Sequence, residues 1–188
     1  MEAIIDDNQL FKSAHAAMTF AFNYEGMPAL SVMNRMAQEP SGMPGKGLSG
    51  IDGSAQAGII RYKLQSLGFL SEAILIADIA PRSRPCSCRS PCCSGHTRNQ
   101  EWSEAINWIS DNVRVEALDG HKTTHPLRRA CVEMYFGVKH TAVKMAHHHD
   151  VSEQTAGLLI RKVKRYLSAA HEKARIEADD VLDCYVIK

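Results

Sequence analysis

Apolar residues along this chain recur mostly at intervals of three and four, the spacing that places them on one face of an α-helix. Trp102, Ile106, Ile109 and Val113 follow this spacing and predict a helix that buries the tryptophan. Few segments alternate between apolar and polar residues, as a half-buried strand does. The pattern therefore predicts an all-α protein organised as a helical bundle.

Glycines, prolines and changes in charge divide this bundle into six segments. Residues 39–55 contain two prolines and five glycines, which favours a linker or a long loop over regular structure. A helical pattern resumes near Ser54, breaks at Gly68 and stops before Pro81. The predicted segments are an N-terminal helical segment (1–38), the linker (39–55), a helical body (56–81), a cysteine-rich insert (82–98), a second helical body (99–175) and an acidic C-terminal tail (176–188).

The stretch 141–167 predicts two helices joined by a short turn, as in a helix-turn-helix. Ala146 is small enough for a close helix crossing, and Val151 is the apolar residue that we expect to be buried after the turn. Ser152 is a natural N-cap, because its hydroxyl can accept a hydrogen bond from an amide of the second helix. Asp150 stands where glycine is usual, and aspartate tolerates a left-handed backbone better than most residues.

The second of these helices has the layout of a recognition helix. We expect its core-facing residues to be Val151, Thr155, Leu158, Leu159, Val163 and Leu167. The residues predicted to contact DNA are Ser152, Glu153, Gln154, Gly157, Arg161, Lys162, Lys164 and Arg165. Short polar groups near the start of the helix suit base edges, and basic groups further along suit phosphates. The alternative is the solvated face of an ordinary helical hairpin.

Charge supports a nucleic-acid partner once its distribution is considered. The 188 residues carry a net charge of only +1, and 45% are hydrophobic, which predicts a folded core. Residues 121–175, however, contain eleven Lys and Arg against four Asp and Glu, a net charge of +7. A positive field of this density attracts polyanions, because each phosphate that it neutralises releases counterions.

The insert contains four cysteines and a histidine within residues 85–96. The acidic N-terminus does not suit a signal peptide, and no apolar run reaches the ~18 residues that span a bilayer, so we expect a cytoplasmic protein without membrane contact. Stable disulfides are rare in that compartment, which favours a metal site. The candidate zinc ligands are Cys86, Cys88, Cys93 and His96, with Cys92 as a substitute; an unmetallated loop is the alternative.

Other histidines are weaker candidates for metal binding. His121 and His125 share helical spacing, but Gly120 and Pro126 bound them, and a solvated loop is favoured. The three consecutive histidines 147–149 would fan over ~200° of a helix and could not share an ion. We expect them to be mostly exposed.

Two stretches resemble known families. Residues 128–167, RRACVEMYFGVKHTAVKMAHHHDVSEQTAGLLIRKVKRYL, resemble the fourth region of bacterial sigma factors. Residues 48–60, LSGIDGSAQAGII, followed by a cysteine-rich insert, resemble the antitermination protein Q family of lambdoid bacteriophages. This second resemblance implies that the insert is a zinc finger and that residues 128–167 read DNA.

The Q resemblance also implies a function and partners. Such a protein binds a DNA element of the phage late promoter, joins host RNA polymerase paused with its sigma factor, and lets it read through terminators. A host elongation factor and nascent RNA are further candidate partners, and the cell is a bacterial host. No substrate chemistry is implied, and the sequence contains no phosphate-binding glycine loop, nucleophile elbow or paired-carboxylate motif.

Two other functions are compatible with the same features. One is a zinc-stapled helix-turn-helix repressor or activator, which would act by occupying DNA alone. The other is a metal-dependent nuclease. Because a nuclease usually needs an acid beside an open metal position, the absence of Asp and Glu from residues 82–98 disfavours it.

Overall fold

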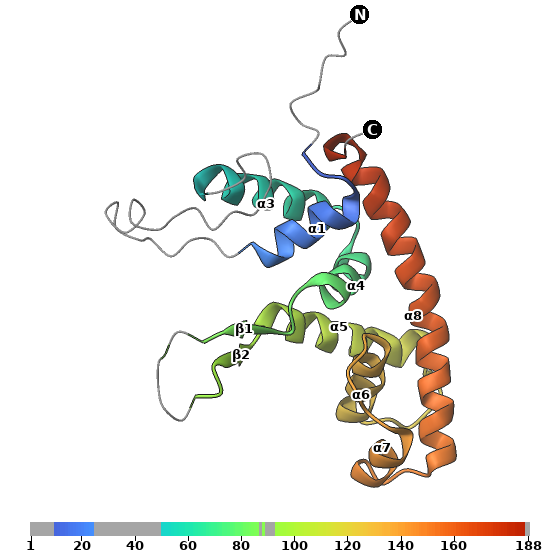
Figure 1. Ribbon diagram of the computed structural model, residues 1–188. Helices are drawn as coiled ribbons and strands as arrows, with labels where there is room; N and C mark the ends of the chain where they lie inside the picture. The colour runs from blue at the N-terminus through green and yellow to red at the C-terminus, as the bar shows by residue number, and fades with distance from the viewer. Residues whose placement is uncertain (1–9, 25–49, 87, 89–92, 187–188) are drawn as a thin grey trace, which may run out of the picture. The chain divides into compact units, whose positions relative to one another are not determined.

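Helices make up nearly all the regular structure in the described residues of this computed structural model, which are 10–24, 50–86, 88 and 93–186 (Figure 1). The prediction of a mainly helical protein is therefore confirmed, with one short β-hairpin added to it. The chain divides into two units, Met1–Ser66 with Ala178–Lys188, and Leu67–Glu177. Each unit is described by itself.

In the first unit, helix α1 (Ala14–Asn23) packs on helix α3 (Gly50–Gln65). The buried residues of this unit are Phe11, Ala14, Ala17, Met18, Ala21 and Phe22, with Ala57, Ile60 and Leu64 of α3 and Ala178 and Leu182 further along the chain. Near the C-terminus, the short 3-10 helix η1 (Asp183–Tyr185) precedes Val186, which pairs with Phe11 as an isolated parallel bridge. The amide of Phe11 donates to the carbonyl of Tyr185 at 3.0 Å, so residues from the two ends of the chain lie together.

The described part of the predicted N-terminal helical segment 1–38 contains α1, which begins where the Ser13 hydroxyl accepts a hydrogen bond from the Ala16 amide at 3.1 Å and caps it. The predicted linker 39–55 differs from the structure, because helix α3 begins inside it, at Gly50; Asp52 in its first turn is favourable at the positive end of the helix dipole. The rest of the segment 1–38 and of the predicted linker, residues 1–9 and 25–49, lies outside the described residues.

In the second unit, helix α5 (Gln100–Glu116) packs against both α4 (Phe69–Ile79) and α6 (His125–Tyr135). The stripe predicted on α5 is confirmed, because Trp102, Ile106, Ile109 and Val113 are all buried. The Trp102 indole nitrogen also donates to the carbonyl of Ala77 at 3.0 Å, which joins α5 to α4. Burying this polar group with its hydrogen bond made avoids the cost of an unsatisfied donor.

The chain then forms α7 (Ala142–His148) and the 30-residue helix α8 (Glu153–Leu182). Polar side chains attach α8 to the other helices of the unit. Tyr166 donates to Asn112 of α5 at 2.7 Å, and His171 lies 3.1 Å from the Tyr135 hydroxyl of α6 and 3.2 Å from an Asp78 carboxylate oxygen of α4. These bonds join the middle of α8 to α4, α5 and α6.

Candidate metal centre and nucleic-acid interface

The cysteine segment emerges from a two-stranded antiparallel hairpin, β1 (Ser83–Pro85) with β2 (His96–Arg98). The hairpin replaces the loop expected from the sequence, because three-residue strands are too short to show alternation. Asn99 fixes the base of the hairpin: its side chain donates to the Pro81 carbonyl at 2.7 Å and accepts from the Glu101 amide at 3.1 Å, capping α5. The hairpin is therefore joined directly to the N-terminus of a buried helix.

Three of the predicted ligands come together at the tip. The sulfur atoms of Cys86, Cys88 and Cys93 all lie within 4.8 Å of one another and could hold a metal ion. Cys88 is exposed, and the other two are partly buried, so the site is accessible from solvent. Within the part of the chain that the structure describes, this is the one such group of three or more histidine, cysteine or acidic side chains.

The chain makes a tight turn directly after Cys93. Gly95 adopts a positive φ of 79°, and its amide donates to the Cys93 sulfur at 3.4 Å. The Gly95 amide lowers the pKa of the Cys93 thiol, but the thiols of Cys88 and Cys86 and slight desolvation raise it, and the net direction is upward. Three thiols so close together resist ionisation unless a cation is present to compensate their charge.

The remaining two candidate ligands have different outcomes. His96 is exposed on β2, opposite Pro85, and its ring does not belong to the cysteine group. It is therefore not brought into the preferred four-ligand set. Cys92 lies outside the described residues, and its role as the substitute ligand stays a prediction.

Arginines around the hairpin bond to the helical body. Arg98 lies 3.2 Å from a Glu133 carboxylate oxygen, and Arg84 lies 3.5 Å from Glu101. Arg82 donates to the backbone carbonyls of Phe136 and Gly137. These contacts hold the base of the hairpin against α5 and the end of α6. The positive charges of Arg84 and Arg98 are therefore paired with carboxylates of the protein itself.

The second candidate site is the pair α7 and α8. Asp150, in the connection between them, has a φ of 52°, the left-handed conformation that its position predicted. The Ser152 hydroxyl accepts a hydrogen bond from the Thr155 amide at 3.1 Å and caps α8, as predicted. Met145 and Ala146 are buried, whereas Val151, expected to be buried, is only partly so.

The buried face of α8 differs by one residue from the predicted one near its start. Ala156, Leu159, Val163 and Leu167 are buried, but Thr155 and Leu158 are exposed, and their predicted core positions are wrong. Thr155 instead lies in the first turn, where its hydroxyl bonds to Ser152 at 2.8 Å. Leu159, Val163 and Leu167 keep their predicted core positions, so the difference is confined to the first two turns of α8.

Most residues predicted to contact DNA are on the solvent-facing surface of α8. The exposed ones are Ser152, Glu153, Gln154, Arg161, Lys162, Lys164 and Arg165; Gly157 is partly buried. Lys162 also donates to the His121 ring at 2.8 Å. The start of α8 thus presents acid, amide and hydroxyl groups, and the following two turns present cations.

The other histidines occupy several environments. His125 begins α6, because Pro126 suits the first turn of a helix, so the loop predicted there ends one residue earlier. His147 and His148 are exposed as predicted, but His149 is partly buried and its ring packs edge-on against His148, with centroids 4.9 Å apart.

Sequence reasoning missed Glu133 of α6, a carboxylate shared by two arginines and a histidine. It lies 2.9 Å from Arg129, 3.2 Å from Arg98 and 3.2 Å from His140. The i, i+4 spacing from Arg129 was a visible signal, whereas Arg98 comes from the hairpin and His140 from the loop after α6.

Comparison with known proteins gave no match to a family model, a curated protein or a solved structure. Among the described helices, none combines the length and apolar character required to cross a lipid bilayer.

Proposed function

We propose that this chain is a Q-type transcription antitermination factor that binds duplex DNA through α7 and α8. The observation that carries the DNA-binding part is the exposed surface of α8. Polar groups at its capped start precede Arg161, Lys164 and Arg165, which are all exposed and lie about two to three turns further along the helix. This order suits a helix that presents its N-terminal residues to bases and its cations to phosphates.

Zinc at the hairpin tip belongs to the same proposal. Zn–S bonds of ~2.3 Å in a tetrahedron place sulfur atoms ~3.8 Å apart, so the three thiols, all within 4.8 Å, need only a small contraction. His96 or Cys92 supplies the fourth ligand by a rearrangement of the turn. With four protein ligands the ion staples the hairpin and has no open position for catalysis.

The antitermination part rests on the resemblance of residues 48–60 to the Q family, most of which form the first turns of α3. In this function the protein binds a late-promoter element, contacts host RNA polymerase with its sigma factor, and acts without chemistry on a substrate. A zinc-stapled repressor or activator would use the same DNA surface, and polymerase dependence separates the two.

The decisive experiment is transcription with purified polymerase and sigma factor. The template carries a duplex site selected from a random library by this protein, a promoter-proximal pause and a distant intrinsic terminator. We expect increased read-through, lost in Arg161→Ala/Lys164→Ala and kept in Arg175→Ala. Changed initiation with unchanged read-through would identify a repressor or activator, and reproducible nicking of plasmid with Mg²⁺ would identify a nuclease.

A further inference from the structure

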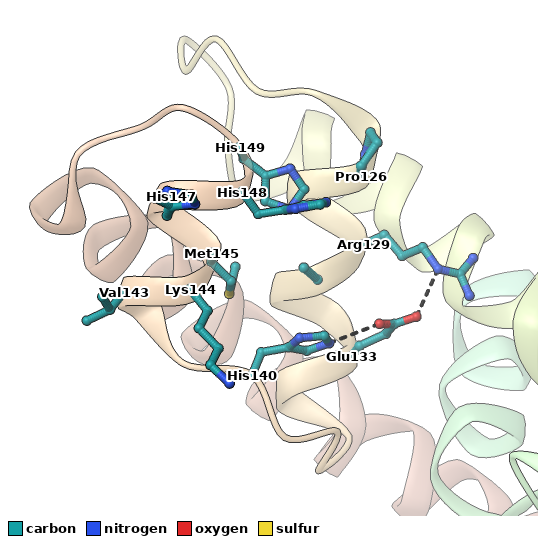
Figure 2. A pocket seen from close by; sticks show the side chains of 11 residues that line it. Pro126, Arg129, Glu133, His140, Val143, Lys144, Met145, His147, His148 and His149 are labelled. Carbon is teal, nitrogen blue, oxygen red and sulfur yellow. Dashed lines mark hydrogen bonds and ion pairs between the residues drawn. The ribbon is translucent and has the colours of Figure 1, made fainter.

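A cavity of about 730 Å³ opens between α6 and α7, and none of its lining residues is among those predicted to bind zinc or contact DNA (Figure 2). Its apolar lining comes from Pro126, Ala130, Val143 and Met145. Its polar lining comes from Arg129, Glu133, His140, Lys144 and the histidines 147–149. In Figure 2, His148 and His149 lie on one side of the opening, whereas His140 lies beside Glu133 on the other.

The charge of this pocket is positive because its single acidic lining residue is already paired. Glu133 lies 2.9 Å from Arg129 and 3.2 Å from Arg98, so two permanent cations surround one carboxylate. Arg129 also bonds to Asn107 and Ser103 of α5, which directs it away from the opening. Lys144 is exposed and remains the permanent cation at the opening itself.

Imidazoles provide further donors. Burial, together with the nearby rings of His148 and His140, lowers the pKa of His149, so this ring gains a proton at a lower pH than an ordinary histidine. Two of the last four backbone carbonyls of α7 already accept hydrogen bonds. Met145 accepts from the His149 amide and Ala146 accepts from the Val151 amide, both at 3.0 Å.

A metal ion fits this arrangement poorly. Figure 2 shows His140 across the pocket from His148 and His149. Among the described residues, the cysteine trio of the hairpin is the one group of three or more candidate ligands with donor atoms within 4.8 Å of one another. A pocket with separated N–H donors and an exposed ammonium instead suits a ligand with several oxygen acceptors.

We propose that the pocket between α6 and α7 binds a phosphate group, and that this group belongs to the backbone of bound duplex DNA. The second part rests on the proposed function. His149 precedes the N-cap of α8 by only three residues, which places the pocket beside the start of the helix that we assign to DNA. Phosphate contacts on either side of a reading helix fix its register in the groove.

The test compares Lys144→Ala with Lys139→Ala. Both remove one exposed lysine from neighbouring positions, but only Lys144 lines the pocket. Duplex binding is measured by fluorescence anisotropy from 50 to 200 mM salt. Loss of one phosphate contact lowers the salt slope by ~0.9, so wild-type affinity falls ~3.5-fold more than that of Lys144→Ala over this range. Lys139→Ala should retain the wild-type slope.

Imidazole NMR signals identify the source of the phosphate. With wild-type protein and its two variants His148→Gln and His149→Gln for assignment, duplex DNA, inorganic phosphate and a 5′-mononucleotide are titrated separately at pH 6.5. Shifts of the His148 and His149 signals with DNA, together with the reduced slope of Lys144→Ala, support the proposal. Equal or stronger shifts with the mononucleotide support a phosphate site but overturn its assignment to DNA.

Failure of this site and failure of the proposed function give different results. If DNA binds, Arg161→Ala lowers the slope, and Lys144→Ala and both imidazole signals stay unchanged, the phosphate site is wrong and the DNA surface of α8 stands. If wild-type protein binds no duplex but the mononucleotide shifts both imidazole signals, the phosphate site stands and DNA binding is wrong. Thermal melting confirms that each variant is folded.

Discussion

The DNA surface of α8 can be tested with two arginines of the same helix. Arg161 and Arg175 are both exposed. Fourteen residues separate them, which corresponds to a rotation of only ~40° around the axis and a shift of ~21 Å along it. Arg161→Ala and Arg175→Ala therefore change the net charge equally and expose a similar side of the helix. The two positions differ in their distance from the capped start of α8, which we propose contacts the DNA bases.

The expected magnitude follows from counterion release. If Arg161 contacts one phosphate, its loss lowers the slope of log affinity against log salt by ~0.9. Over a fourfold rise in salt, wild-type affinity should then fall ~3.5-fold more than that of Arg161→Ala, and ~12-fold more than that of Arg161→Ala/Lys164→Ala. Arg161 is well placed for this contact: a Cβ added at Gly157 would lie 3.8 Å from its guanidinium, so the side chain extends toward the start of α8.

The assay is fluorescence anisotropy with a labelled duplex at four salt concentrations, at constant pH. We expect a reduced slope for Arg161→Ala and an unchanged slope for Arg175→Ala, with all melting temperatures equal because both side chains are exposed. Equal slopes for wild type and Arg161→Ala would refute the assignment. An equal reduction in both variants would show that the effect comes from net charge and not from a phosphate contact near the start of α8.

Three further predictions concern the structure itself. Freshly purified, reduced protein should contain about one zinc per chain by metal analysis; Cys86→Ser should abolish this and lower the melting temperature, and metal-free wild type would refute the site. Arg128→Ala should destabilise the protein by ~2–4 kcal/mol in denaturant unfolding, because Arg128 is only 5% exposed and its guanidinium donates to the carbonyls of Ser110 and Thr123 at 3.0 and 2.9 Å. A loss of stability below ~1 kcal/mol would contradict this interpretation. Cys131 should resist alkylation in native protein at pH 8, because burial raises its pKa to about 11 and leaves ~0.1% thiolate; rapid modification without unfolding would refute its burial.

Local features of this fold could be predicted from sequence where their cause lies within a few residues. The stripe on α5, the cap at Ser152 and the left-handed Asp150 depend on helical spacing, a hydroxyl near an amide and a permissive side chain, all visible in the sequence. The glycine turn next to Cys93 belongs to the same group, since only its own amide and a sulfur two residues away are involved.

Errors arose where a choice between neighbouring positions depends on tertiary packing. Leu158 is a more obvious core candidate than Ala156 by side-chain type, yet Ala156 is fully buried and Leu158 is exposed. A small residue at a close helix approach contributes by leaving room and not by apolar area, so hydropathy alone ranks Ala156 below Leu158. How near α8 approaches its neighbours cannot be read from the sequence.

Polar groups that join distant segments were the least predictable part. Arg128 was expected only as the start of a supporting helix, and its burial depends on carbonyls of Ser110 and Thr123 that its own segment does not reveal. Glu133 shows the same difficulty, because its partners Arg98 and His140 lie 35 residues before and 7 residues after it.

Taken alone in the sequence, each of these residues looks like an ordinary exposed charged residue. Their contacts depend on which chain segments the fold brings together. The approach of α6 and α7 likewise forms the pocket between these two helices. Sequence motifs point to the cysteines, whereas the ion pairs of the structure point to Glu133, whose carboxylate joins the hairpin, α6 and the loop before α7.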